Sequence, residues 1–244
     1  MSSFQVQRMF KEGAAPCYSF TSIVIPNFEY GFIGRGIFDS AVSIEESRRQ
    51  LQISYPEYHL ALPKQVHGDT VIDLRTQAHQ CKIGAPVYEG DAIIFSRDES
   101  KPMYYGIRTA DCLPVMIIGA RSLAIVHAGW RGLAARILSR ACQLFGDDQP
   151  TYALIGPAAG RDRYQVGHEV IDAIGDNGAY RYQETDNSYY LDLAGTAHRE
   201  LLVASPGIRI EDAAVCTISD QRFHSHRRDG ANSGRNLLYV RSLL

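Results

Sequence analysis

The chain has 244 residues, of which 45% are hydrophobic and 21% are charged, and its formal net charge at pH 7 is -2. These values are ordinary for a folded protein with a sizeable core. Its basic residues are scattered, which argues against nucleic-acid and membrane-surface partners. The sequence has neither a signal-peptide pattern nor about 18 consecutive apolar residues, so we expect no export and no membrane span. Its five cysteines are odd in number and widely spaced, which argues against a disulfide framework and favours the cytoplasm.

Apolar runs and helical patterns predict the elements in chain order. A strand is predicted at 22–26. A helix is predicted to begin after Ser43 and to run through Leu51, because Ser43 and Glu46 form a capping-box pattern. Strands follow at 70–74, 91–96, 103–108, 113–118 and 123–127, then a helix at 132–145, a strand at 152–156, and helices at 166–174 and 192–203. Because strands and helices do not alternate regularly, we expect an α+β fold of mixed β-sheets flanked by helices. No repeat or linker divides the chain, so residues 1–244 are predicted to form one domain.

Three segments combine metal-binding residue types with glycine or a strand end, where a rigid scaffold presents reactive groups. They read KQVHG at 64–68, TADCLP at 109–114 and VHAGWRG at 126–132. The imidazoles of His67 and His127 and the thiolate of Cys112 would suit a zinc ion with an open fourth position. However, spacings of about 45 and 15 residues match no local zinc motif. Hydrogen-bonded loop histidines and a buried cysteine therefore remain an open alternative at this point.

Two of these segments, extended to TADCLPV at 109–115 and VHAGWRGLA at 126–134, resemble the YfiH family, also called the laccase-domain or multicopper polyphenol oxidase family. Further similar segments occur in the family's order. They read QVHG at 65–68, GDA at 90–92, IGPA at 155–158, YQVG at 164–167, YLDL at 190–193, CT at 216–217, RRDG at 227–230 and GR at 234–235. The resemblance implies mixed sheets flanked by helices, similar to the catalytic domain of the cytotoxic necrotizing factor toxins.

The resemblance also implies a metal and an activity. His67, Cys112 and His127 would bind zinc, and copper could occupy the same ligands adventitiously. The implied reactions are phosphorolysis of adenosine, inosine, guanosine and methylthioadenosine, and hydrolytic deamination of adenosine. The implied ligands are thus purine nucleosides and phosphate, and we expect a monomer or a weak homodimer.

Other residues are candidates for the remaining chemistry. Asp111 or Asp91 could carry protons during deamination, although support of the ligands or a strand-end cap is an equally good interpretation. Arg35 is the first candidate to hold phosphate, followed by Arg131 and then by the pair at 227–228; each could instead form a surface ion pair. Gln65 and Arg131 are expected to contact the substrate.

The match is imperfect in three places, one of which is the segment around 162–165, where Asp162 and Arg163 replace a pair of cysteines and Gln165 replaces a glutamate. The segment after Arg35, at 36–43, departs from the family's pattern, which makes that assignment less secure than the zinc ligands. His224 and His226 form the chain's one His-x-His, which we interpret as solvated side chains rather than as a metal site.

Other functions compete with the zinc enzyme. A copper polyphenol oxidase needs many paired histidines, which eight histidines with one His-x-His do not supply. Without metal, Cys112 and His127 could form the nucleophile and base of a thiol amidohydrolase. A non-catalytic zinc-binding protein would need a closed four-ligand site, for which His168 and Cys216 are the candidate fourth ligands.

Overall fold

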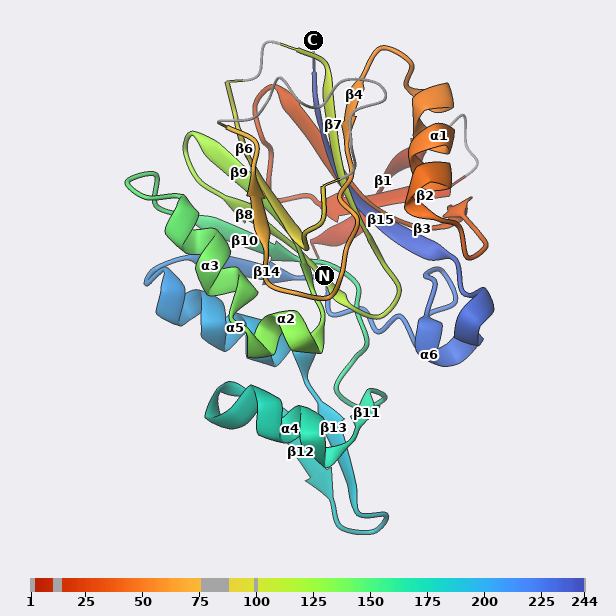
Figure 1. Ribbon diagram of the computed structural model, residues 1–244, viewed down its shortest axis with the longest axis vertical. Helices are drawn as coiled ribbons and strands as arrows, with labels where there is room; N and C mark the ends of the chain where they lie inside the picture. The colour runs from red at the N-terminus through yellow and green to blue at the C-terminus, as the bar shows by residue number, and fades with distance from the viewer. Residues whose placement is uncertain (1–2, 11–14, 76–87, 99–100, 244) are drawn as a thin grey trace.

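The computed structural model describes residues 3–10, 15–75, 88–98 and 101–243, so Cys81 lies outside the described part. Two six-stranded sheets form the main body, and a three-stranded sheet projects from it (Figure 1). Parallel and antiparallel pairs occur in both large sheets, which confirms the predicted α+β class with mixed sheets. None of the described helices is long and apolar enough to cross a membrane. The extent of the domain, 1–244, stays a prediction.

The first sheet joins the two ends of the chain. Its order is β1 (Phe4–Phe10), β2 (Ala15–Phe20), β3 (Phe28–Phe38), β15 (Arg235–Ser242), β7 (Met103–Thr109) and β4 (His59–Ala61). The last strand, β15, is antiparallel to β3 on one side and to β7 on the other, with Leu237 opposite Arg108. The sheet is therefore complete only when the C-terminal segment has inserted into its middle.

The second sheet carries the most apolar strands of the chain. Its order is β14 (Arg209–Asp212), β10 (Tyr152–Ile155), β8 (Leu113–Ile118), β9 (Ser122–Ala128), β6 (Ala92–Ser96) and β5 (Val71–Asp73). Every residue of β8 and β9 is buried, because both faces of this sheet are covered. The two strands form an antiparallel hairpin in which Leu113 faces Ala128 and Pro114 faces His127.

Helices cover the outer faces of the two sheets and give four layers (Figure 1). Helix α1 (Ile44–Ser54) buries Ile44 and Leu51 against the first sheet. The hydroxyl of Ser43 accepts the N–H of Glu46 at 3.1 Å, which confirms the predicted cap. On the second sheet lie α2 (Trp130–Ala134), α3 (Ile137–Leu144) and α5 (Leu193–Ala204).

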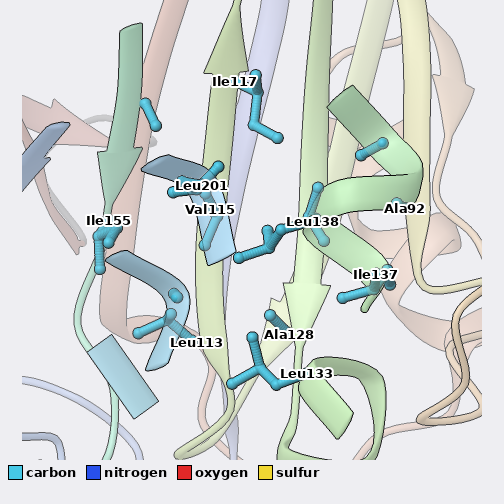
Figure 2. Close-up of a cluster of buried hydrophobic side chains, with 14 of the residues drawn as sticks. Ala92, Leu113, Val115, Ile117, Ala128, Leu133, Ile137, Leu138, Ile155 and Leu201 are labelled. Atoms are coloured by element: carbon cyan, nitrogen blue, oxygen red, sulfur yellow. The ribbon is translucent and has the colours of Figure 1, made fainter. Parts of the chain in front are cut away.

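Separate apolar clusters join the layers. Between the two sheets, Phe95 of β6 stacks on Tyr105 of β7 with ring centroids 3.6 Å apart. Between the second sheet and its helices, Leu133, Ile137 and Leu138 pack on side chains of β8 and β9 (Figure 2). Burying a side chain of this size contributes about 1.5–3 kcal/mol, so these clusters fix the strand ends that carry the functional residues.

A small arm projects from the body (Figure 1). It comprises β11 (Gln165–Val166), α4 (His168–Ile174), β12 (Tyr180–Gln183) and β13 (Ser188–Leu191), with β13 between the other two strands. The remaining helix, α6 (His226–Asp229), lies beside the end of the first sheet.

Some predicted elements are wrong or misplaced. Residues 22–26 form a turn and extended loop instead of a strand, and Val24 is 85% exposed. The helix predicted at 132–145 is two helices, because Arg136 adopts a left-handed conformation (φ 64°) between α2 and α3. The helix predicted at 166–174 begins at His168, since Val166 pairs with Tyr189 of β13 and Gly167 is the extended N-cap residue.

Candidate metal centre

The structure brings the three predicted metal ligands together although they are far apart in sequence. His67 lies in the loop between β4 and β5, Cys112 in the turn from β7 to β8, and His127 in β9. Their ligand atoms all lie within 4.8 Å of one another, so this group could hold one metal ion. The two histidine rings meet nearly edge-to-face, with centroids 4.9 Å apart.

Two glycines in the segment after His127 allow this close approach. A Cβ atom at Gly129 would lie 3.1 Å from the Sγ of Cys112 and 3.5 Å from the Cδ2 of His67. A Cβ atom at Gly132 would lie 2.9 Å from the carbonyl oxygen of Gly68. The glycines therefore make room for two ligands and for the loop that carries one of them.

Asp91, at the start of β6, holds two of the ligands in place. Its fully buried carboxylate accepts a hydrogen bond from Nδ1 of His127 at 2.8 Å, which leaves Nε2 of that ring for a metal. The same carboxylate accepts the backbone N–H groups of Val66, His67 and Gly68 at 3.2, 2.9 and 2.8 Å. A carboxylate behind a ligating histidine is the usual means of fixing ring orientation. Of the two roles weighed for Asp91, this geometry favours support of the ligands.

The backbone is strained on both sides of the centre. His67 (φ 61°) and Asp111 (φ 88°) lie in the left-handed region, which residues other than glycine seldom adopt. Such conformations persist where surrounding contacts impose them, and they cluster at functional sites. Here the contacts of Asp91 impose the first, and those of Asp111, described below, impose the second.

The ligand group favours charge separation in the absence of metal. Burial would raise the pKa of the Cys112 thiol, but the charge of His127 and hydrogen bonds to both histidines lower it to about 6. Burial would likewise lower the pKa of His127, but the Cys112 thiolate and the Asp91 carboxylate raise it to about 9. A deprotonated Cys112 is the form that binds a metal.

A cavity of about 470 Å³ opens onto the three ligands. This volume lies in the range of about 300–1,000 Å³ that is typical of small-molecule sites. Aromatic and cationic side chains line it, and a second, more open hollow of about 510 Å³ adjoins it. The two hollows share Trp130, Arg131, Tyr164 and Arg227. The guanidinium of Arg131 lies over the Trp130 ring at 4.2 Å, and that of Arg227 lies over the Tyr164 ring at 5.0 Å.

The other predicted site residues fall in different places. Gln65 and Arg131 line the cavity. The amide of Gln65 is paired with the backbone of Arg108 in β7, donating to its carbonyl at 2.7 Å and accepting its N–H at 2.9 Å. Arg35 is not among the residues that line the cavity; its guanidinium makes a 3.0 Å ion pair with Asp229 of α6. Of the two arginines at 227–228, Arg227 lines the cavity and Arg228 does not.

Asp111 lines the cavity, but its carboxylate is already engaged. One oxygen accepts the hydroxyl of Thr217 at 2.6 Å, and the other accepts the backbone N–H of Arg227 at 2.6 Å. Its carbonyl accepts the N–H of Ala159 at 2.9 Å. Asp111 therefore ties together three segments that surround the centre.

Neither candidate fourth ligand joins the group. His168 lies on α4 in the arm, where its Nδ1 contacts Asp172 at 2.8 Å. Cys216 accepts the N–H of Gly160 at 3.2 Å and lines a different cavity. Among the described residues the group thus has three members, which is the number that catalytic zinc sites use.

Several residues of the cavity are not predicted as site residues by the sequence. Arg108 directly precedes the TADC segment. Tyr164 and Arg235 belong to segments that are similar to the family, but no role follows from that similarity. His226 lines the cavity and is exposed, as predicted, whereas His224 is buried and contacts Asp39 at 3.1 Å, so the interpretation as a solvated side chain is wrong for His224. Only the order of the strands, which sequence periodicity does not give, brings these residues to one place.

Comparisons with known proteins agree with this geometry. Residues 25–242 match the family described as multi-copper polyphenol oxidoreductase laccase. A purine nucleoside phosphorylase from Xylella fastidiosa (strain 9a5c) is 38% identical over 210 residues, covering 81% of this chain and 78% of that protein. An adenosine deaminase from an unknown prokaryotic organism is 29% identical over 215 residues, covering 81% of each. The crystal structure of YlmD from Geobacillus stearothermophilus has the same fold, with a TM-score of 0.81, 22% identity and full coverage of both chains.

The family match covers the second sheet, the first sheet except β1 and β2, and all three clustered ligands, and the similar fold covers the whole chain. The chain therefore belongs to the multi-copper polyphenol oxidoreductase laccase family.

Proposed function

We propose that this protein is a zinc-dependent purine nucleoside enzyme. Its reactions would be phosphorolysis of adenosine, inosine, guanosine and methylthioadenosine, and hydrolytic deamination of adenosine. The observation that carries the proposal is the three-ligand group of His67, Cys112 and His127, which faces a cavity of nucleoside size. Relatives named as a purine nucleoside phosphorylase and an adenosine deaminase support the two reactions.

The ligand set fits zinc. Two imidazoles and one thiolate are ligands that zinc accepts in catalytic sites, and the absence of a Cβ at Gly129 leaves room for Cys112 and His67. When bound, zinc supplies a Lewis acid that can polarise substrate oxygens and lower the pKa of water to about 7. Copper would bind the same ligands, so copper in a preparation would not by itself indicate an oxidase.

The chain's own residues would supply the rest. Phosphorolysis forms a bond between a phosphate oxygen and C1′ of the ribose while the bond from C1′ to the purine nitrogen breaks. The electron pair of that bond leaves with the base, which takes up the proton that phosphate gives up. The cationic lining of the cavity would hold the phosphate, and Trp130 and Tyr164 offer aromatic surface to the base. That Arg35 takes part in phosphate binding and that Asp111 carries protons stay predictions.

A second candidate function rests on the charge separation between Cys112 and His127. A thiolate beside an imidazolium is the arrangement of thiol nucleophiles, so a metal-free amidohydrolase is a specific alternative. A non-catalytic zinc protein is the third possibility, and the open three-member group argues against it. The cytoplasmic location and the monomeric or weakly dimeric state also stay predictions.

Elemental analysis and an activity assay on one preparation test these functions. Purified protein would be analysed for zinc and copper, then incubated with adenosine with and without phosphate, and the products separated by chromatography. We expect about one zinc per chain, adenine and ribose 1-phosphate only with phosphate, and inosine in both conditions. Chelation should abolish all turnover, and added zinc should restore it.

Two results would contradict the proposal. Turnover of an amide substrate that survives chelation and is lost in Cys112→Ser would establish the thiol enzyme. One zinc per chain without any turnover of nucleosides would favour the non-catalytic protein. The variant Cys142→Ser is the matched control, because this cysteine is buried in α3 and lies outside the ligand group.

A further inference from the structure

Two arginines lie side by side on one wall of the cavity. Arg108 is near the end of β7 and Arg235 begins β15, and both line the cavity. Because Leu237 is opposite Arg108 in the antiparallel ladder, Arg235 is the diagonal neighbour of Arg108 on the same face of the sheet. Neither guanidinium forms an ion pair with a carboxylate in the described part of the chain.

Protein oxygens accept hydrogen bonds from one terminal nitrogen, Nη1, of each guanidinium. Nη1 of Arg108 donates to the carbonyls of Val42 and Ser43 and to the hydroxyl of Ser47, at 3.0, 3.1 and 2.8 Å. Nη1 of Arg235 donates to the two preceding carbonyls at 2.7 and 2.9 Å. The Nε of Arg108 is buried and has no hydrogen-bond partner within the described residues. A buried donor without an acceptor is costly to the folded protein.

The charges of the cavity are unbalanced. Burial lowers the pKa of Arg108 to about 10; the charge of Arg235 adds to this shift, and the charge of Glu45 opposes it. Arg131 and Arg227 add two more cations, whereas the one carboxylate of the lining, Asp111, already accepts two hydrogen bonds. The cavity therefore has four guanidinium groups and one engaged carboxylate, which favours an anionic ligand.

We propose that Arg108 and Arg235 form the phosphate subsite of this cavity. The inference rests on the proposed function, because phosphorolysis requires a phosphate beside the nucleoside. A phosphate has several acceptor oxygens, which suit the forked donors of two adjacent guanidiniums. The chemical class bound is a phosphate group, and the proposed source is inorganic phosphate.

The assay compares two reactions of one enzyme. Arg235→Ala and Arg235→Lys would be tested for phosphorolysis of adenosine over a range of phosphate concentrations, and for deamination without phosphate. We expect the KM for phosphate to rise at least tenfold in the alanine variant and less in the lysine variant. Phosphorolysis should fall at least tenfold more than deamination, and zinc content should not change. The control is Arg49→Ala, an exposed α1 residue paired with Glu46, which should match the wild type in every measurement.

A binding measurement separates the subsite from the reaction. Inorganic phosphate should raise the midpoint of thermal unfolding of the wild type, and much less that of Arg235→Ala. This result would support the subsite even if the wild type performs no phosphorolysis, in which case the proposed function alone fails. Arg108→Lys keeps the charge and guards against a variant that does not fold, and it too should raise the KM for phosphate.

Three outcomes would overturn the proposal. One is an unchanged KM for phosphate in both Arg235→Ala and Arg108→Lys, with both variants folded by circular dichroism. Another is an equal loss of deamination and phosphorolysis in Arg235→Ala, which would indicate a general role in the cavity. The third is a thermal shift that depends on Arg235 with adenosine 5′-monophosphate but not with inorganic phosphate, which would assign the pair to a nucleotide.

Discussion

Replacement of Asp91 by asparagine removes the charge that holds the metal centre together. The carboxylate accepts four hydrogen bonds, one from Nδ1 of His127 and three from successive backbone N–H groups beginning at Val66. An asparagine keeps one acceptor oxygen, and its amide N–H₂ would face groups that also donate. At least one of the present donors would therefore lose its acceptor inside a fully buried site.

The expected magnitude follows from these contacts. Loss of a carboxylate behind a ligating histidine typically weakens metal binding about 10–100-fold. That factor corresponds to about 1.4–2.7 kcal/mol in binding free energy. A buried donor without an acceptor costs about 1–3 kcal/mol of stability as well. We thus expect Asp91→Asn to raise the Kd for zinc about 10–100-fold and to lower the free energy of unfolding by about 2 kcal/mol.

The assay is a zinc competition against a chromophoric chelator, with urea denaturation of the metal-free protein in parallel. Asp69→Asn is the matched control, because Asp69 lies two residues after His67 but pairs with Arg140 at 2.8 Å on the surface. The control should keep the wild-type zinc affinity. Equal zinc affinity in Asp91→Asn and the wild type would refute the argument that this carboxylate orients the ligands.

The remaining predictions concern the ligands, one arginine and one buried acid. Cys112→Ala and His127→Ala should each lose zinc and activity together, because three ligands are needed for a tight site; full activity in either variant would exclude the zinc mechanism. Arg35→Ala removes the ion pair to Asp229 and should reduce phosphate-dependent turnover more than zinc content, so loss of zinc would instead indicate a structural role. Burial raises the folded-state pKa of Glu200 above 4.5, so its contribution to stability is present in acid and declines as pH rises through the folded pKa. Glu200→Gln should remove that decline, so the wild type should lose more stability than the variant between pH 5 and pH 8; an equal change of urea midpoint in both proteins would contradict this.

The sequence predicts best the elements nearest the centre. Strands β5 to β10 are short apolar runs, and the residues that follow or precede them, such as Cys112 and His127, are correctly placed at strand ends. The resemblance then identifies the three ligands that the structure groups together. These are local patterns, so a single sequence reveals them.

The rest of the fold depends on contacts that local patterns do not contain. Strand β3 includes Gly31, Gly34 and Gly36, which interrupt its apolar pattern, yet it lies inside the first sheet. The break at Arg136 has no helix-breaking residue, and the left-handed turn there is a consequence of packing α2 and α3 separately on the sheet. The arginine pair of the cavity comes from strands that are neighbours only because β15 inserts beside β7.

The position of the metal centre has a consequence for mutations in the interior. The loop before β5 is fastened to one sheet through Gln65 and to the other through Asp91, and Cys112 lies where the chain crosses between them. The geometry of the metal centre therefore depends on the spacing between the two sheets. Phe95 and Tyr105 set that spacing with their stacked rings, so a smaller side chain at either position would loosen metal binding without touching a ligand. We therefore expect mutations between the two sheets to weaken metal binding before they unfold the protein.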